Sequence, residues 1–350
     1  MSQENQNIQE EPHKRRVRYK GKYPRNYKEK YKELNPEKYQ DTIEKVIRKG
    51  STPAGMHISI MVREIIDFLQ IKPGQTGFDA TLGYGGHTKA MLECLKGQGH
   101  MYATDVDPIE SAKTKKRLAD AGFGEDILTI RLQNFCTIDE IAKEAGGFDF
   151  VLADLGVSSM QIDNPDRGFS FKVDGPLDLR LNPEKGISAA ERLAQIDEDE
   201  LAGMLWENSD EPYAEELAHA IVTERKHGKP IDTTTRLREV IEETLSFLPE
   251  KEKKDTVKKT CQRTFQALRI DVNNEFEVLY EFMEKLPGAL KPGGRAAILT
   301  FHSGEDKLVK KALKQGYKEG VYSEIANDVV RPSAEECAQN GRARSTKMRW

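Results

Sequence analysis

Apolar positions in residues 60–153 follow two alternating periods, which predicts strands and helices in turn. Four short apolar runs have the length of buried strands: 77–80, 101–104, 127–132 and 148–153. The other stretches have apolar residues at helical spacing: 60–69, 88–95, a helix from Pro108 that carries Ala112 and Leu118, and 138–145. Strands and helices in turn, joined by short connections, predict a parallel sheet wound by helices on both faces.

The alternation stops at Arg167 and resumes near residue 260. Between them, helical spacing predominates at 189–206, 213–226 and 237–248, and no run has a clear strand pattern. A long helix over 265–286 and a strand over 296–301 are then expected. We therefore expect an α/β fold that is interrupted by an all-helical insertion. The expected domains are a basic extension (1–52), an α/β domain (53–166 and 260–350) and the helical insertion (167–259).

Charge changes the picture at the N-terminus. Residues 1–52 carry 14 Lys and Arg against 8 Asp and Glu, so the net charge of −4 divides into +6 for this segment and −10 for the rest. Four tyrosines recur at every fourth position among these cations: Tyr19, Tyr23, Tyr27 and Tyr31. A basic arm with aromatic rings is typical of RNA contacts. The same rings could instead dock the arm onto the body of the protein.

Cysteine usage and hydropathy exclude several classes of protein. Four well-separated cysteines form no CxxC pair, which argues against a zinc site or a disulfide framework and favours a reducing cytoplasm. We expect no metal. No apolar stretch approaches the roughly 18–20 residues that span a bilayer, and residues 1–11 are polar and acidic rather than signal-like, so no membrane contact is expected.

A glycine-rich turn follows the first expected strand. Residues 79–87 read DATLGYGGH. Glycines at such a turn let a nucleoside-bearing ligand approach the backbone at the carboxyl ends of the strands. The dinucleotide fingerprint G-x-G-x-x-G fails because Thr88 stands at its third glycine, which disfavours a nicotinamide dehydrogenase. S-Adenosylmethionine has no pyrophosphate and tolerates a looser cluster. A plain tight turn would leave the same pattern.

Acidic residues follow the next strands. Asp105 ends the second strand, where a carboxylate can accept hydrogen bonds from both ribose hydroxyls. Asp107, directly before Pro108, fits a helix N-cap better. Asp154 follows the strand 148–153 and could hold the cofactor or accept hydrogen bonds from a target amine. His302 also follows a strand, and an orienting, hydrogen-bonded role fits it better than that of a base.

Several blocks together resemble one family. They are DATLGYGGH (79–87), DVDP (105–108), DLGVSSMQID (154–163), RGFSF (167–171), GPLDLR (175–180), RTFQALRIDVNNE (263–275), FHSGED (301–306) and RARSTKMR (342–349). They resemble the bacterial 16S ribosomal RNA (cytosine-N4-)-methyltransferases of the Rsm H or MraW family, over about residue 57 to the C-terminus. The resemblance implies a class I, Rossmann-like methyltransferase domain with an inserted helical substrate-recognition domain.

The resemblance also implies site residues and partners. Cofactor contacts would come from Gly85, Gly86, His87, Asp105, Phe135, Asp154 and Gln161. Phe135 would pack on the adenine, although its sequence context alone indicates core. Asp154, or a backbone carbonyl near it, would accept the N4 proton. The substrate would be 16S ribosomal RNA within the small ribosomal subunit, and a homodimer stays open.

Two alternatives remain at this stage. A methyltransferase of the same fold could act on a protein or a small molecule, and the acidic body favours that reading. The basic C-terminal residues favour RNA: Arg342, Arg344, Lys347 and Arg349. A non-catalytic RNA-binding protein could also keep the fold.

Overall fold

The computed structural model describes residues 59–350, so the basic arm and its tyrosines lie outside the described residues. Six strands form one sheet in the order β3-β2-β1-β4-β5-β6. The strands are β1 Thr76–Asp79, β2 His100–Asp105, β3 Leu128–Leu132, β4 Phe148–Asp154, β5 Leu290–Thr300 and β6 Lys347–Arg349. β1 to β5 are parallel, and β6 pairs antiparallel with β5. This is the Rossmann-like, doubly wound arrangement that the sequence predicts.

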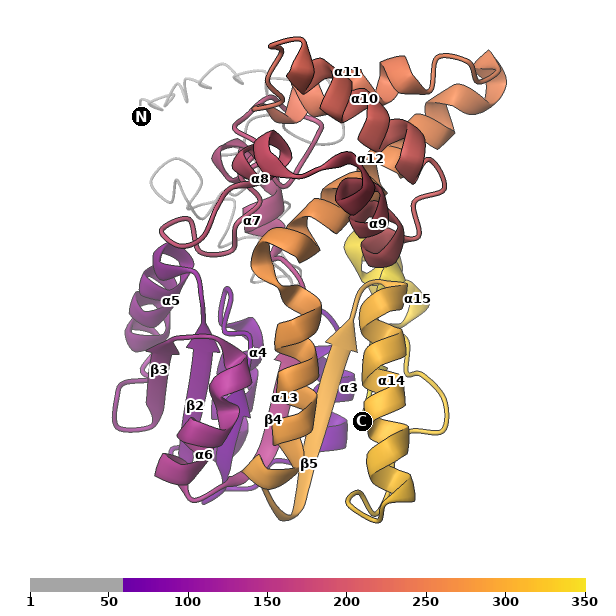
Figure 1. Cartoon of the computed structure of the whole chain (residues 1–350). Helices are drawn as coiled ribbons and strands as arrows, with labels where there is room; N and C mark the ends of the chain where they lie inside the picture. Colours follow the sequence, from indigo (N-terminus) through magenta and orange to yellow (C-terminus); the bar gives the residue numbers. More distant parts are fainter. Residues whose placement is uncertain (1–58) are drawn as a thin grey trace, which may run out of the picture. The chain divides into compact units, whose positions relative to one another are not determined.

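Helices cover both faces of the sheet (Figure 1). One face packs against α3 Val62–Leu69, α4 Gly86–Leu95 and α5 Pro108–Asp120, and the other against α6 Ile138–Ala145, α13 Glu275–Ala289 and α14 Ser303–Lys318. Side chains of β4 alternate between the two cores. Phe150 and Leu152 join the first, whereas Val151 and Ala153 join the second. Both faces of β4 are therefore buried, which explains its unbroken apolar run.

The segment between β4 and β5 is helical. Its main helices are α8 Ala189–Gln195, α9 Glu198–Ser209, α10 Ala214–Lys226, α11 Thr234–Thr244 and α12 Glu250–Asn273. They share one apolar cluster that runs from Phe169 to Leu268. Only isolated bridges, such as Pro176 with Thr233, occur there among the described residues. The cluster extends into α12 beyond residue 259, and the domain boundaries at 167 and 259 stay a prediction.

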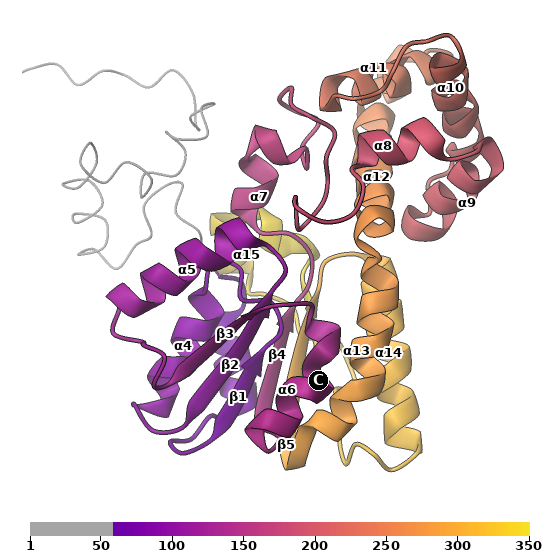
Figure 2. The same ribbon diagram turned by 60° about the vertical axis from the view of Figure 1, so that its left-hand side comes forward.

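Two expected helices are wrong in extent. The stretch 189–206 is divided because Asp197 caps a new helix by accepting from the Glu200 backbone N–H. The long helix over 265–286 is two helices, and Asn274 separates them in the left-handed conformation with φ 49°. Asparagine tolerates this conformation better than most residues, so it can turn the chain here. Figure 2 shows α12 leading from the insertion to α13 beside the sheet.

Short elements complete the chain around the site. They are the 3-10 turns Phe135–Thr137, Pro165–Arg167 and Gly341–Ser345, and the helices α7 Ser159–Asp163 and α15 Ala334–Gln339. Among residues 59–350, none of the helices combines the length and the apolar character that crossing a bilayer requires.

Candidate active site

A cavity of about 370 Å³ opens at the carboxyl ends of β1, β2, β4 and β5. All seven residues predicted to contact the cofactor line it: Gly85, Gly86, His87, Asp105, Phe135, Asp154 and Gln161. Its volume is in the range of small-molecule sites. The structure thus brings the predicted residues together, while their individual contacts with a ligand stay a prediction.

The glycine turn after β1 forms one wall of the cavity. Gly83 and Gly85 have φ values of +48° and +82°, which L side chains rarely adopt. At Gly86 an added Cβ would lie 2.0 Å from Ser59 Oγ, so a side chain there would require Ser59 to move. Thr88, the residue that breaks the dinucleotide fingerprint, donates a 2.6 Å hydrogen bond to buried Asp79. Thr114 and Arg117 of α5 also donate to the carbonyls of Gly83 and Tyr84, so side chains of α4 and α5 hold the turn together.

Asp105 is held by backbone groups. Its Oδ2 accepts from Gly83 N at 2.8 Å and its Oδ1 from Asp107 N at 2.9 Å. Burial raises the pKa of this carboxyl to about 6, although both backbone hydrogen bonds act to lower it. Each oxygen keeps a lone pair, so the carboxylate can still accept two ribose hydroxyls from the cavity.

Asp107 has a different task. Its Oδ1 caps α5 by accepting from the backbone N–H groups of Ile109 and Glu110, which confirms the predicted N-cap. Its Oδ2 accepts from Gln161 Nε2 at 2.9 Å and from Arg167 Nη1 at 2.6 Å. Gln161 therefore lines the cavity with its amide already engaged. Asp107 is fully buried and has no role left for a ribose.

Arg167 lies at the start of the helical segment and ties it to this acid. Besides the bond to Asp107, its Nη2 donates to the carbonyls of Arg180 and Leu181. Both side chains are almost completely buried, and they form an ion pair at 2.6 Å. The loop that carries Asp105 is thereby joined directly to the segment that leads into the insertion.

His87 and Asp154 form a buried pair. His87 Nε2 lies 2.8 Å from the Ile60 carbonyl oxygen, and Nδ1 lies 3.4 Å from Asp154 Oδ2. The other oxygen, Asp154 Oδ1, is buried and has no hydrogen-bond partner among the described residues. Burial, aided by the charges of Asp79 and Glu305, raises the pKa of Asp154 to about 6, against the lowering effect of His87. Asp154 thus offers one unused acceptor at the cavity.

Phe135 lies between the cavity and the core. It follows β3, lines the cavity and is half-buried. Its ring also packs edge-on against Phe282 of α13, with centroids 5.2 Å apart. One part of the ring belongs to the core, and the cavity-facing part can pack on a flat ligand such as an adenine.

The junction of α12 and α13 forms a polar wall that the sequence analysis did not identify. Arg269 donates to both oxygens of Glu275, at 2.7 and 2.8 Å. Asn273 accepts from Leu181 N at 2.7 Å and donates to the Leu179 carbonyl. All three residues line the cavity. Helical spacing predicted that this stretch belongs to one core helix. The left-handed conformation of Asn274 instead ends α12 and starts α13, and the side chains at this junction line the cavity.

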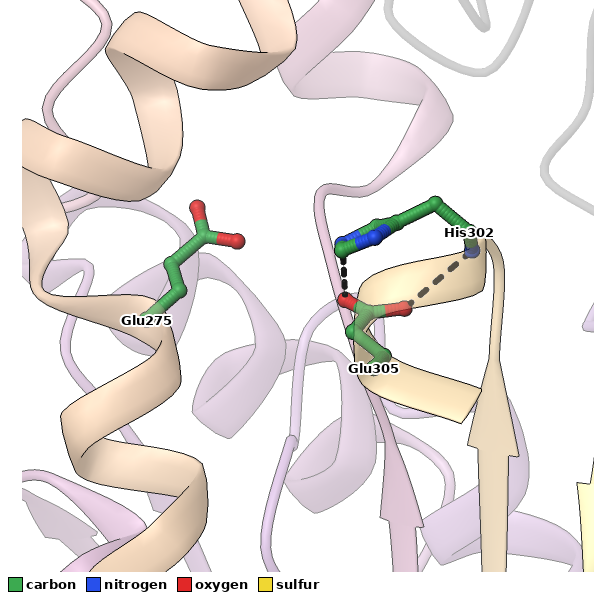
Figure 3. Close-up of side chains that lie close together, drawn as sticks. All are labelled: Glu275, His302 and Glu305. Carbon is green, nitrogen blue, oxygen red and sulfur yellow. Dashed lines mark hydrogen bonds and ion pairs between the residues drawn. The ribbon is translucent and has the colours of Figure 1, made fainter. Parts of the chain in front are cut away.

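His302 lies beside this wall (Figure 3). Its Nε2 is 3.1 Å from Glu305 Oε1, and Glu305 Oε2 accepts from Phe301 N at 2.8 Å. Burial alone would raise the pKa of Glu305, but the hydrogen bond and charge of His302 and the charge of Arg269 hold it below its usual value. His302 is therefore a partner of Glu305, in line with the orienting role predicted for it.

Glu275, His302 and Glu305 have the donor types of a metal site, with ligand atoms within 4.8 Å of one another. Their oxygens are already used, however. Arg269 occupies both oxygens of Glu275, and Glu305 is bonded to the start of α14. A cation here would lie beside a guanidinium group. The cluster is better described as an ion-pair network.

Most of the C-terminal cations form ion pairs within the fold. Lys347 and Arg349 pair with Asp306, and Arg342 pairs with Asp163 at 2.8 Å. Arg344 is exposed. The basic end of the chain mainly fastens β6 and the 3-10 turn before it, so three of its four cations give little support to RNA binding.

The fold and the site together define a class I methyltransferase, a class that uses S-adenosylmethionine. The cavity fits that cofactor: a glycine turn with left-handed residues, an acid at the end of β2 and an aromatic ring after β3. A profile of the MraW methylase family matches residues 54–350. The chain belongs to that family.

Relatives agree over nearly the whole length. The chain is 82% identical to "Ribosomal RNA small subunit methyltransferase H 1" of Agathobacter rectalis, over 98% of each chain. It is 71% identical to the protein of the same name from Lachnoclostridium phytofermentans, over 98% of this chain and 93% of the relative. A more distant relative, "Ribosomal RNA small subunit methyltransferase H" of Thioalkalivibrio sulfidiphilus, is 37% identical over 85% of this chain and 97% of its own.

Proposed function

We propose that this protein methylates the exocyclic N4 of a cytosine in the decoding centre of 16S ribosomal RNA. Its relatives are named as methyltransferases of small-subunit ribosomal RNA, which supports the RNA as substrate. The atom is suggested by Asp154, whose Oδ1 is buried at the cavity without a partner. An exocyclic amine supplies the hydrogen-bond donor that this oxygen lacks. We place the reaction in the cytoplasm, on RNA within the small subunit.

The chemistry asks little of the protein beyond alignment and a proton acceptor. S-Adenosylmethionine supplies an electrophilic methyl group bound to a sulfonium. Cytosine N4 is a weak nucleophile because its lone pair is delocalised into the ring, so positioning matters. Asp154 Oδ1 accepts a hydrogen bond from the amine and orients it. As the new N–C bond forms, N4 loses a proton and Asp154 is the acceptor within reach.

His87 positions this acceptor. A carbonyl oxygen only accepts, so the contact with Ile60 O requires a proton on Nε2. Nδ1 then faces Asp154 Oδ2, and one proton must lie between them because two lone pairs would repel each other. The contact with His87 acts to lower the pKa of Asp154 and leaves Oδ1 free for the substrate. With both ring nitrogens engaged, His87 would meet the cofactor only through its carbon atoms.

Asp154 could alternatively bind only the cofactor, by accepting a hydrogen bond from the amino group of S-adenosylmethionine. The remaining assignments are Asp105 for the ribose, Phe135 for the adenine and the glycine turn for close approach of the cofactor. Arg269, Asn273 and Glu275 then line the side from which a target base enters. The base must leave its stack to reach the cavity, which favours a flexible or partly open RNA.

Mass spectrometry of ribosomal RNA nucleosides tests the proposal. Cells that lack the protein should lack N4-methylcytidine at one position, and the purified protein should restore it on small subunits. Transfer of labelled methyl groups to a protein fraction, with RNA unlabelled, would favour the protein substrate instead. Cofactor binding without any transfer would favour a non-catalytic RNA-binding protein.

A further inference from the structure

Helix α14 carries a row of lysines on its exposed side. Five of its 16 residues are exposed lysines: Lys307, Lys310, Lys311, Lys314 and Lys318. Lys307, Lys311, Lys314 and Lys318 are three or four positions apart, so they are neighbours on successive turns of one side, and Lys310 lies directly beside them. The opposite side, with Val309 and Leu313, is buried against the core. We call these five residues the lysine row.

Few acidic residues of the fold neutralise the positive charge of the lysine row. No Asp or Glu occurs between Asp306 and Glu319. Lys307 lies 3.8 Å from Asp210, and within residues 59–350 the other four have no ion-pair partner. Like charges four positions apart destabilise a helix slightly. Apart from Lys318 in the last turn, where a cation is favourable, the row therefore does not stabilise α14, and an anion outside the fold would explain it.

Another lysine-rich helix provides a contrast. The first turns of α12 also contain five lysines, but Glu250, Glu252 and Asp255 are interleaved with them. Such mixed charge is typical of a solvated surface. The uninterrupted row on α14 is distinctive in a chain whose part outside residues 1–52 has a net charge of −10.

The lysine row starts at the active site. Phe301 and Glu305, at the beginning of α14, line the cavity. Figure 1 shows α14 running from the carboxyl end of β5 back along the sheet. From Lys307 to Lys318 the helix rises about 16 Å. A polyanion that enters the cavity could therefore follow this helix away from it.

We propose that the lysine row binds phosphates of the RNA strand that flanks the target nucleotide. The inference rests on the proposed function, because it takes the same RNA as ligand. Lysine heads contact phosphates without regard to base sequence, so the row would hold and orient the strand while the cavity selects the base. Tyr317, half-exposed among the lysines, adds a ring at the far end of the row.

The test replaces Lys311, Lys314 and Lys318 with Gln in one variant. The matched control replaces Lys113, Lys115 and Lys116 of α5, which are also exposed but lie beside β3 at the other edge of the sheet. Affinity for a small-subunit ribosomal RNA fragment is measured at several salt concentrations. At about 0.1 M salt, each lost phosphate contact should weaken binding roughly five- to tenfold and reduce the slope of log K against log salt by about 0.7–0.9.

The outcomes separate the two proposals. A weaker affinity and a lower slope in the α14 variant, with the control unchanged and calorimetric cofactor binding intact in both, support the lysine row. Equal RNA binding by both variants overturns it, while methylation by the wild type would still uphold the proposed function. A loss confined to assembled subunits, with naked RNA bound normally, would assign the row to a ribosomal protein and also overturn it. No RNA binding or methylation by the wild type would refute both proposals.

Discussion

Four carboxylates follow strands β1, β2 and β4, and their hydrogen bonds separate their roles. Asp79 is bonded to Thr88 and Asp107 to α5, Gln161 and Arg167, so both belong to the framework. Asp105 accepts from two backbone groups and keeps lone pairs toward the cavity. Asp154 keeps a whole oxygen unpartnered. Position at or after a strand end predicted Asp105 and Asp154 as site residues and Asp107 as an N-cap, and the hydrogen-bond partners in the structure distinguish their roles.

Asp105→Ala should weaken S-adenosylmethionine binding by about 1–3 kcal/mol, the usual result of losing hydrogen bonds to a charged group. Titration calorimetry measures this directly. Asp120→Ala, at the exposed end of α5, is the control and should bind normally. An unchanged affinity in Asp105→Ala would assign the ribose to another residue, although Asp107 is no longer a candidate.

Asp154→Asn and Asp154→Ala should both abolish or strongly depress methylation of cytosine. Cofactor affinity, measured by calorimetry beside turnover, distinguishes the roles. If Asn preserves affinity while kcat collapses, Asp154 is the proton acceptor; if both fall together, it is mainly a cofactor ligand. Normal turnover in both variants would rule out either role.

The raised pKa of Asp154 also predicts an effect on stability. Its folded-state pKa of about 6 exceeds the ordinary aspartate value of 3.8, so the fold favours the protonated form and loses that benefit as pH rises through 6. Asp154→Asn should therefore increase the free energy of unfolding by about 1–3 kcal/mol at pH 7, and by less at pH 5. Urea unfolding at the two pH values measures the difference. A variant less stable than the wild type at pH 7 would contradict this reading.

Among the elements, α6 was predicted to the residue, and the strands to within one or two residues except at β5, which begins six residues early. The apolar runs of β1 and β4 are buried on both faces, so periodicity and length suffice for them. The break at Asn274 was missed because Phe265 to Leu286 keep helical spacing across it. The backbone turn depends on one left-handed residue and on Asn273 being bonded to Leu179 and Leu181. Such long-range partners leave no local pattern.

Arg167 joins two elements, the loop after β2 and the start of the helical segment. Arg167→Ala would leave buried Asp107 unpaired, which is strongly destabilising. Arg167→Lys keeps the charge but cannot reach Asp107 and both carbonyls with the same geometry. We expect Arg167→Lys to fold, with a lower melting temperature and a cofactor affinity reduced about threefold to thirtyfold.

Thermal melting and calorimetry of Arg167→Lys measure both effects. Arg131 of β3 forms an exposed ion pair with Glu144, so Arg131→Lys is the matched control. This variant should change neither the melting temperature nor the cofactor affinity. If Arg167→Lys lowers the melting temperature but binds the cofactor normally, the link is purely structural and does not act on Asp105.

On the scale of the whole molecule, the basic segment 1–52 lies before the family match, which begins at residue 54. The predicted cofactor residues begin at Gly85, and among the described residues those that line the cavity begin at Ser59. Deleting residues 1–52 should thus leave cofactor binding intact. RNA affinity should fall, and the salt slope should flatten by roughly 0.7–0.9 for each lost phosphate contact.

The alternative is an arm that docks on the body through its tyrosines. In that case the truncated protein would melt at a lower temperature and keep its salt slope. Both quantities are measured on one truncated protein, and the unchanged slope is the result that would reject an RNA-binding arm.

The helical insertion also affects the order of folding. The pair β1 and β2 joins residues such as Asp79 and Ala103, which are 24 positions apart, whereas β4 and β5 join Asp154 and Leu299, which are 145 apart. Closing the longer loop from an unstructured chain would need about 1.6 kcal/mol more in entropy. The insertion has its own apolar cluster, so it can collapse first and bring the ends of this loop together. Mutations in that cluster should therefore slow the docking of β5 during refolding, although none of its buried residues belongs to a strand of the sheet.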